Sequence, residues 1–520
     1  MRLEKILESQ ALRLAERTAL VCGTERISYA ALVERTQQVA LGLRSRGIKP
    51  GDRVVLFLPN GVEIIELFFA AFMVGAIVVP VTTRLTAYEL DHICRDCMPS
   101  VIAVDGASEA VEQTLSAYPQ ALRITIGRDF VGAVHYASIK SAATGELPSL
   151  PAEPDDALIM YTSGTTGKPK GAIITHANVI VQHRFINGVE WRISDEDCFL
   201  VTTPLAHRTG FARMANALTL GGTLVVMKKF DAREAVELIC RESISVAGMV
   251  PTVCRMLLPE IQADPTKCAS LRTIVVTGEA FPVDLKRKFI SLLPSVRLVS
   301  FFAMTEAGAV TSLSHEEQFD HADSVGRPTA GVETRIVDEK GSPLPVGQAG
   351  ELLVRAGEPG RYSVMKGYFN RPAENAEAIR EGWIHTGDIA KSDEQGYLYI
   401  VDRKKDMVLS GGFNIYTKEV EQALMANPDI VDAAVVGVPD PIFGEAVAAF
   451  IEPAPGRQPT AVSVIEHVRD RIAGYKKPKH VFIVAELPRN SLGKVLKNEL
   501  RESARHAAEV RNEAIAANEI

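Results

Sequence analysis

The chain has 520 residues, which is too long for one hydrophobic core and indicates roughly three folding units of about 150 residues each. Its 47% hydrophobic and 23% charged residues are typical of a globular protein, and a net charge of −7 excludes a global basic field that would attract nucleic acid or an anionic membrane. Its seven cysteines, an odd number scattered along a large chain, indicate buried thiols in a reducing cytoplasm rather than a disulfide framework.

The N-terminal stretch "MRLEKILESQALRLAERTAL" predicts a mixed-charge amphipathic helix, because its acidic residues and short apolar runs do not fit a transit or signal peptide. The longest apolar run, residues 67–79, is shorter than the ~20 residues that span a bilayer. Gly75 interrupts it, which predicts the end of a buried helix followed by a buried strand. Cys94 and Cys97 form a C-x-x-C without a second pair nearby, which favours packing over a zinc or redox role.

Up to about residue 330, apolar strands alternate with longer helical patterns, which predicts an α/β fold with mainly parallel sheets. Residues 331–401 are instead short strands separated by turn residues, with a hairpin loop at 393–396. A charged cluster, "DRKKD" at 402–406, precedes a smaller α+β pattern. The predicted domains are therefore an N-terminal domain, 1–402, and a C-terminal domain, 403–520.

The segment "YTSGTTGKPKG", residues 161–171, directly follows the apolar run "ALIM". Its glycines allow backbone N–H groups to point at one anion, while its hydroxyls and lysines add donors and charge, so it predicts a phosphate-binding loop. It is not a Walker A loop, because Gly164 and Gly167 are too close together and "GAIITH" predicts a strand where that motif begins a helix. A surface loop without a ligand is the alternative.

Further segments occur along the chain in a fixed order: "TPLAHRTG", "VVTGEAFP", "FFAMTEAG", "GWIHTGD", "VDRKKDMVLSGGFNI" and "PRNSLGK". Together with the glycine-threonine loop they resemble the motifs of the adenylate-forming superfamily, and specifically the AMP-dependent acyl-CoA synthetases. The resemblance covers about residues 25 to 500. It implies a small β-barrel-like subdomain within the N-terminal domain and a mobile C-terminal domain.

The resemblance implies ATP, Mg²⁺ and coenzyme A as the small molecules bound besides the acid. The residues it assigns to ATP or AMP are Thr162, Ser163, Gly164, Thr165, Thr166, Gly167, Lys168, Lys170, Gly278, Glu279, Ala280, Phe302, Thr305, Asp388 and Arg403. Within this set the adenine pocket is expected at 278–280 and Phe302, the α-phosphate donor at Thr305, and the ribose contacts at Asp388 and Arg403.

The same resemblance assigns catalytic and conformational roles. Glu306 resembles the Mg²⁺ ligand, with Thr165 as a helper, and oxygen ligands suit this hard cation. Lys494 resembles the lysine that bridges the carboxylate and the α-phosphate. Lys405 is expected to be the hinge, and Gly411 and Gly412 are expected to line the coenzyme A channel.

The acyl pocket is expected to be apolar, as for an aliphatic (medium- or long-chain) or aryl acid. Its predicted residues are His207, Phe211, Thr277, Phe301, Ala303 and Met304. His207 is a candidate gate or orienting donor. Arg208 and Arg213 flank the pocket. Their partners could be a distal polar or carboxylate group of the substrate, neighbouring loops or a phosphate.

The predicted function is ATP-dependent: a carboxylic acid becomes an acyl-AMP with release of pyrophosphate, and its acyl group then passes to coenzyme A. The alternative acceptor is the pantetheine of a carrier protein. A non-catalytic nucleotide-binding protein is disfavoured because Lys494 and Glu306 are both present, and a luciferase-like oxygenase shares the same motifs. No nucleic-acid partner or membrane span is expected, and the assembly, a homodimer included, stays open.

Overall fold

The structure is a computed structural model, and it describes residues 1–520 except 107, 142–144, 152–155, 163–168, 279–280, 411–412, 441, 470, 490–494 and 506–520. The chain forms two compact units. The first contains residues 1–335, 353–385 and 394–399, and the second contains residues 336–352, 386–393 and 400–520. All of the predicted C-terminal domain thus lies in the second unit.

One sheet of the first unit bears the glycine-threonine loop. Its strand order is β19 (Gly367–Tyr368), β9 (Lys170–Thr175), β8 (Asp156–Thr162), β4 (Ile77–Pro80), β3 (Arg53–Phe57), β5 (Val101–Val104), β6 (Leu122–Thr125) and β7 (Ala133–His135). Strands β3 to β7 pair in parallel, as the alternation of strands and helices predicts, whereas β9 pairs antiparallel with both β8 and β19.

The other large sheet of this unit bears the candidate Mg²⁺ ligand. Its order is β16 (Arg327–Pro328), β15 (Gly308–Leu313), β14 (Arg297–Met304), β13 (Thr273–Val276), β12 (Val246–Met249), β10 (Cys198–Val201), β11 (Thr223–Val226), β1 (Thr18–Cys22) and β2 (Glu25–Ser28). The central pairs from β14 to β1 are parallel. These strands are short and apolar on both faces because helices cover the sheet.

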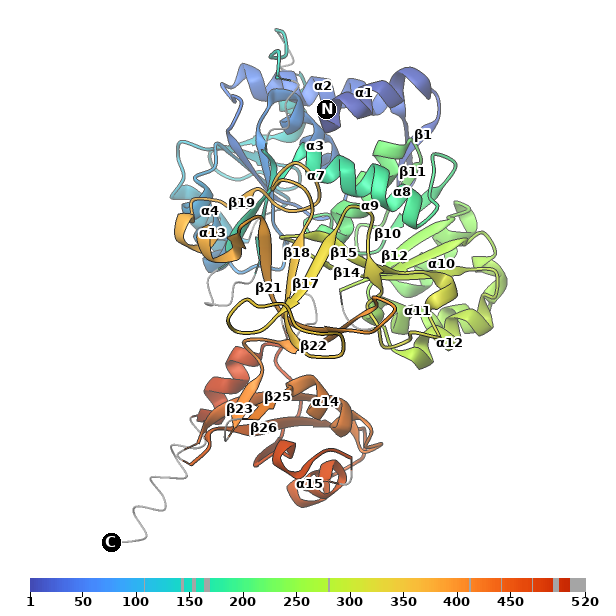
Figure 1. Ribbon diagram of the computed structural model, residues 1–520. Helices are drawn as coiled ribbons and strands as arrows, with labels where there is room; N and C mark the ends of the chain where they lie inside the picture. Colours follow the sequence, from blue (N-terminus) through green and yellow to red (C-terminus); the bar gives the residue numbers. More distant parts are fainter. Residues whose placement is uncertain are drawn as a thin grey trace. The chain divides into compact units, whose positions relative to one another are not determined.

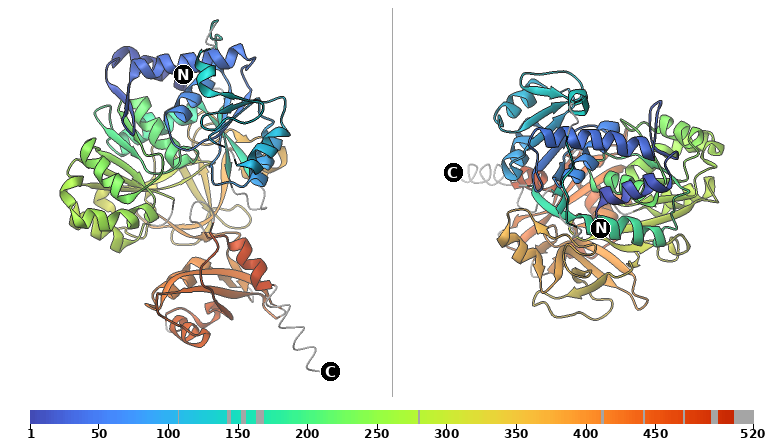
Figure 2. Two further views of the ribbon diagram at one scale, coloured as in Figure 1. Left: turned by 180° about the vertical axis from the view of Figure 1, so that it is seen from behind. Right: turned by 90° about the horizontal axis from the view of Figure 1, so that it is seen from above.

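The helices of the first unit pack on these two sheets (Figure 1). They are α1 (Leu3–Arg13), α2 (Tyr29–Ser45), α3 (Val62–Val74), α4 (Ala87–Cys97), α5 (Glu109–Ser116), α6 (Tyr136–Ser141), α7 (His176–Ile180), α8 (Asn187–Glu190), α9 (Arg208–Leu220), α10 (Ala232–Arg241), α11 (Pro251–Ala263), α12 (Val283–Leu292) and α13 (Pro372–Ala378), with a π-helical stretch, η1, at Val181–Ile186 and short 3₁₀ turns η2 (Pro265–Cys268) and η3 (His315–Glu317). Figure 2 shows α1 and α2 side by side, and the two helices are in contact.

The apolar run at residues 67–79 behaves as its sequence predicts. Helix α3 ends at Val74, Gly75 takes the left-handed conformation with φ of 77°, and β4 follows. Glycine adopts this backbone conformation without the steric cost that a side chain brings. The predicted N-terminal helix is shorter than expected, because α1 ends at Arg13 and the last residues of that stretch enter β1.

A smaller sheet follows, formed by β17 (Glu333–Val337), β18 (Gly350–Arg355), β21 (Trp383–Ser392), β20 (Ile379–Arg380) and β22 (Leu398–Arg403). It is the region of short strands that the sequence predicts between 331 and 401. The predicted hairpin loop at 393–396 separates β21 from β22, which pair with each other.

The C-terminal part of the second unit is an α+β layer. Its sheet contains β24 (Phe413–Ile415), β23 (Val408–Ser410), β26 (Gly444–Pro453), β25 (Ile430–Asp440) and β27 (His480–Ile483). Helices α14 (Thr417–Met425) and α15 (Ala461–Arg469) cover one face, a short 3₁₀ turn, η4 (Gly474–Lys476), precedes β27, and the helical residues 497–505 pack on the other face. The α+β pattern predicted after the charged cluster at 402–406 is confirmed.

Two sequence expectations concern membranes and thiols. In the part of the chain that the structure describes, no helix is long and apolar enough to cross a membrane. Cys94 and Cys97 lie in the apolar core between α4 and its sheet, and burial raises the pKa of Cys94 to about 12.

Candidate active site

The glycine-threonine loop joins two antiparallel strands. Strand β8 ends at Thr162, β9 begins at Lys170, and these two residues are register partners. The strand after the loop confirms the distinction from a Walker A motif, which would begin a helix there. The predicted site residues that lie outside the described part of the chain are Ser163, Gly164, Thr165, Thr166, Gly167, Lys168, Glu279, Ala280, Gly411, Gly412 and Lys494.

The candidate Mg²⁺ ligand lies beside the end of this loop. Tyr368 Oη donates a hydrogen bond of 2.9 Å to Glu306 Oε1, and Lys170 Nζ lies 5.6 Å from the centre of the same tyrosine ring. Strand β19 positions the tyrosine, because it pairs antiparallel with β9 and sets Tyr368 opposite Ala172. The ammonium group of Lys170, at the end of the candidate phosphate loop, and the carboxylate of Glu306, from the motif "MTEAG", therefore both contact the side chain of Tyr368.

The segment before Glu306 is irregular. The register of β14 against β15 shifts between Phe302 and Ala303, which is a β-bulge beside the candidate site. Bulges re-aim side chains at the ends of strands and are common next to active sites. After it, Ala303, Met304 and Thr305 all line a cavity.

This cavity has a volume of about 160 Å³. It is lined by Gln182, His183, Asn187, Trp191, Arg208, Thr209, Ala212, Arg213, Thr277, Gly278, Phe301, Ala303, Met304, Thr305, Gly308 and Ala309. Four predicted acyl-pocket residues, Thr277, Phe301, Ala303 and Met304, are in this set. The lining includes neither His207 nor Phe211, whose ring packs on Phe68 and His183 instead.

His207 is the residue immediately before α9, and its side chain makes no capping hydrogen bond to that helix. Burial, and to a smaller degree the charge of Arg84, lower the pKa of His207 to about 4. The imidazole is therefore neutral at physiological pH, and it can act as a hydrogen-bonding group without carrying charge.

Arg208 and Arg213 come from the first two turns of α9 and both reach the cavity. Arg213 is 2% exposed, and its guanidinium lies 5.1 Å from the ring centre of Trp191. Neither guanidinium forms a hydrogen bond or an ion pair with any residue that the structure describes, and the terminal nitrogens of Arg208 and Nη1 of Arg213 are buried. Burial lowers the pKa of each arginine to about 10, so both stay protonated at neutral pH.

The chain makes room for Arg213 in the middle of a sheet. Gly248 belongs to β12, and a Cβ on this residue would overlap Nε and Cδ of Arg213. Glycine inside a strand commonly marks a close approach by another group. The aliphatic part of the Arg213 side chain thus packs directly against the backbone of Gly248.

A relay of side-chain amides fixes the orientation of His183. The backbone N–H of Ala309 donates to Gln182 Oε1 at 3.0 Å, and Gln182 Nε2 donates to Asn187 Oδ1 at 2.8 Å. The amide nitrogen of Asn187 is thereby left to face His183 Nδ1, 3.2 Å away. Because burial and the two nearby arginines hold the pKa of His183 well below its usual range, the ring is neutral. Its proton is therefore on Nε2, which is buried without a partner among the described residues.

The candidate ribose pair lies in the second unit. Arg403 Nε and Asp388 Oδ1 are 2.6 Å apart, and Asp388 is 2% exposed. Strand β21 carries the aspartate and the end of β22 carries the arginine, so the two motifs meet through strand pairing. Lys405, the predicted hinge, follows in the turn between β22 and β23.

Sequence reasoning missed Tyr368, His183 and Trp191. Tyr368 lies in "MKGYFN", where the tyrosine after glycine is a weak signal, and no spacing rule links it to Glu306. His183 and Gln182 belong to the π-helical stretch η1. Such stretches occur frequently at functional sites, but a sequence does not reveal them.

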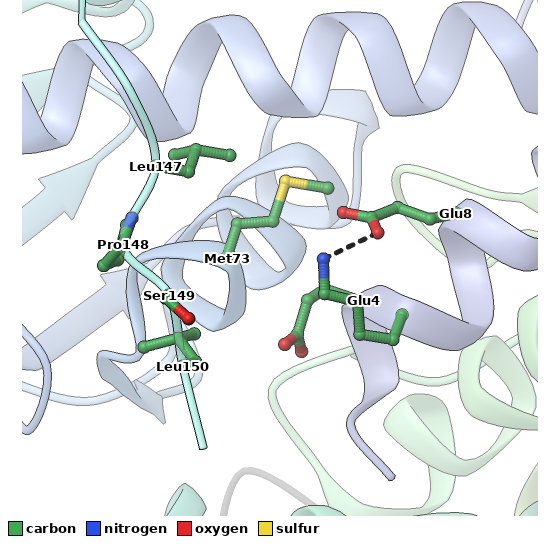
Figure 3. A pocket seen from close by; sticks show the side chains of 8 residues that line it. Glu4, Glu8, Met73, Leu147, Pro148, Ser149 and Leu150 are labelled. Carbon is green, nitrogen blue, oxygen red and sulfur yellow. Dashed lines mark hydrogen bonds and ion pairs between the residues drawn. The ribbon is translucent and has the colours of Figure 1, made fainter. Parts of the chain in front are cut away.

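Figure 3 shows another cavity, also of about 160 Å³, between α1 and residues 147–150. Lys5 and Glu8 form an ion pair of 2.8 Å within it, and most of the remaining lining is apolar, including Met73 and Leu147. Because its charged lysine is already paired, this cavity is a poorer candidate than the one at α9.

The fold and site are those of a nucleotide-dependent enzyme of two units, in which the end of a candidate phosphate loop and an acidic metal-ligand candidate lie beside a cavity. The family model of the AMP-binding enzyme matches residues 7–369. The family model of the AMP-binding enzyme C-terminal domain matches residues 419–494. The chain belongs to the AMP-binding enzyme family, as its motifs predict.

Three known proteins illustrate the relationship. A feruloyl-CoA synthase of an Amycolatopsis species is 36% identical over 93% of this chain and 95% of its own length. The long-chain-fatty-acid–CoA ligase FadD13 of Mycobacterium tuberculosis is 33% identical over 92% and 93%. The crystal structure of ATP-bound MatB from Rhodopseudomonas palustris superposes with a TM-score of 0.86 at 30% identity, covering 97% of this chain and 99% of that one.

Proposed function

We propose that the chain is an AMP-forming acid–thiol ligase that makes acyl-CoA from a compact carboxylic acid. The observation that carries this function is the arrangement of Lys170, Tyr368 and Glu306 at the end of the phosphate loop in a member of the AMP-binding family. The curated relatives that are named as CoA synthases and ligases support coenzyme A as the acceptor.

The reaction has two steps. An oxygen of the substrate carboxylate attacks the α-phosphorus of ATP, and the bond to pyrophosphate breaks as negative charge accumulates on the leaving group. The sulfur of coenzyme A then attacks the acyl carbon, the bond to AMP breaks, and the thiol proton leaves to solvent. Lys170 is suited to the first step, because a fixed cation favours the charge that develops on the phosphates.

Glu306 fits a divalent cation. Its carboxylate supplies hard oxygen ligands, and Tyr368 holds Oε1 in a fixed orientation. Bound Mg²⁺ would add positive charge beside the phosphates. Asp388 and Arg403 are proposed for the ribose hydroxyls, Lys494 for the α-phosphate and the carboxylate, and Lys405 for the hinge of a mobile C-terminal domain.

The size of the cavity favours a compact acid. An apolar protein cavity of about 150 Å³ holds one benzene molecule, and the cavity beside Thr305 has about 160 Å³. Such a volume suits a short aliphatic chain or a single ring, and it is small for a long-chain fatty acid.

The test is a panel of short, medium and long aliphatic acids and of benzoic and cinnamic acids, each with ATP and Mg²⁺. We expect at least one compact acid to release pyrophosphate, and to yield AMP and a thioester once coenzyme A is added. Thioester formation on a pantetheinylated carrier protein but not on coenzyme A would support the alternative acceptor. No pyrophosphate with any acid would overturn the proposal.

A further inference from the structure

We infer that the acid that this chain activates bears a second carboxylate, which binds Arg213 and His183 in the cavity beside α9. The inference rests on the proposed function, because it names the substrate class of the same site.

Among the residues that the structure describes, the charged groups that line the cavity are all cationic. Arg208 and Arg213 contribute two guanidinium groups, and no aspartate or glutamate is among the lining residues that the structure describes. An uncompensated buried cation is costly, and proteins normally pair it with an anion. A guanidinium also presents a planar fork of donors that matches the two oxygens of a carboxylate.

The two arginines differ in position. The charge of Glu306 acts on Arg208, whereas burial alone accounts for the lowered pKa of Arg213. Arg208 therefore lies on the side of the candidate metal ligand, where the reacting carboxylate and the phosphates are expected. Arg213 lies against Trp191 and Gly248 instead, which suits a group remote from the reacting carbon.

His183 adds a donor of fixed direction. The amide relay from Ala309 places its proton on Nε2, and this atom has no partner among the described residues although it is buried beside the cavity. The Nε2–H group of His183 and the guanidinium of Arg213 both donate, so the complementary ligand must accept several hydrogen bonds at once. A carboxylate does so, whereas a methyl or phenyl terminus leaves all of them unpaired.

The first experiment uses the unmodified protein and matched acids with ATP and Mg²⁺, measured by pyrophosphate release. The pairs are pentanoic and glutaric acid, hexanoic and adipic acid, and benzoic acid with the three benzenedicarboxylic acids. We expect a dicarboxylic acid to exceed its monocarboxylic partner at least about 100-fold in kcat/KM, because the monoacid leaves buried donors unpaired. Equal or higher activity with the monoacids overturns this inference and leaves the ligase function intact, whereas no activity with any acid overturns the ligase function.

The second experiment assigns the preference to Arg213. In Arg213→Met the ratio of dicarboxylic to monocarboxylic kcat/KM should fall by about 100-fold, since the desolvated ion pair is lost. Gly248→Ala, which displaces the arginine without changing charge, should shift the ratio in the same direction. Arg255→Met, which changes an exposed arginine of α11, is the matched control and should keep the ratio of the unmodified protein.

A binding measurement separates a specificity role from a purely structural one. The preferred dicarboxylic acid alone, without ATP, should raise the midpoint of thermal unfolding of the unmodified protein but not that of Arg213→Met. An equal rise in both proteins would show that the second carboxylate binds elsewhere, and would overturn the assignment.

Discussion

The phenol of Tyr368 holds the carboxylate of Glu306 through a 2.9 Å hydrogen bond between residues 62 positions apart in the chain. The same ring lies under the ammonium group of Lys170. The tyrosine side chain thus connects Lys170, at the end of the candidate phosphate loop, to the candidate metal ligand, and we expect it to act as a positioning residue.

Replacement of this tyrosine by phenylalanine tests that role. Tyr368→Phe keeps the ring and removes a hydrogen bond to a carboxylate, which is worth about 1.5–3 kcal/mol. We expect the Mg²⁺ concentration for half-maximal pyrophosphate release to rise about tenfold, with little change in thermal stability. An unchanged Mg²⁺ dependence would show that Glu306 needs no such support.

The ion pair of Asp388 and Arg403 gives a second prediction. In Asp388→Asn the acceptor keeps its shape but loses its charge, so Arg403, whose side chain is 36% exposed, loses its charged partner. The KM for ATP should rise at least tenfold if the aspartate also accepts from the ribose. Lys404→Gln, which breaks the neighbouring pair with Glu351, is the control and should leave the KM for ATP unchanged.

The neutral state of His207 predicts a loss of stability in acid. Its pKa is about 4 in the folded protein against 6.5 in the unfolded chain. Between these values the unfolded chain binds more protons, so the free energy of unfolding falls as the pH is lowered from 6.5 to 4, by on the order of 2 to 3 kcal/mol from this residue. Denaturant unfolding at pH 7 and pH 5 measures the loss, which His207→Gln should reduce. An equal loss in both proteins would contradict the assigned pKa.

Lys494 is expected to serve only the first step. Lys494→Ala should abolish pyrophosphate release from acid and ATP, and should spare thioester formation from a pre-made acyl adenylate. Lys340→Ala, an exposed lysine of the same unit, is the control. Equal loss of both half-reactions in Lys494→Ala would refute the role.

Much of the fold could be predicted, because the strands and helices leave local patterns. The alternation of strands and helices before residue 330 predicted the parallel sheets. Gly75, which interrupts an apolar run, predicted the boundary between α3 and β4. The hairpin at 393–396 also follows from a short-range signal, the turn residues between two short strands.

The contacts of the site were harder to predict, because they depend on long-range pairing. Tyr368 reaches Glu306 only because β19 pairs with β9. Phe211 was expected in the pocket, but one face of α9 turns Thr209 and Arg213, one turn apart, toward the cavity, while Phe211 lies on a different side and contacts Phe68. The relay to His183 begins at a backbone N–H that no sequence pattern marks.

Gly248 has a consequence for the redesign of this enzyme. A Cβ at position 248 would overlap Nε and Cδ of Arg213, so any residue larger than glycine there displaces an arginine that lines the cavity. An alanine would expel the guanidinium while leaving every polar residue of the lining in the sequence. Substitution of residue 248 could therefore change which acids the enzyme selects without changing the two reaction steps.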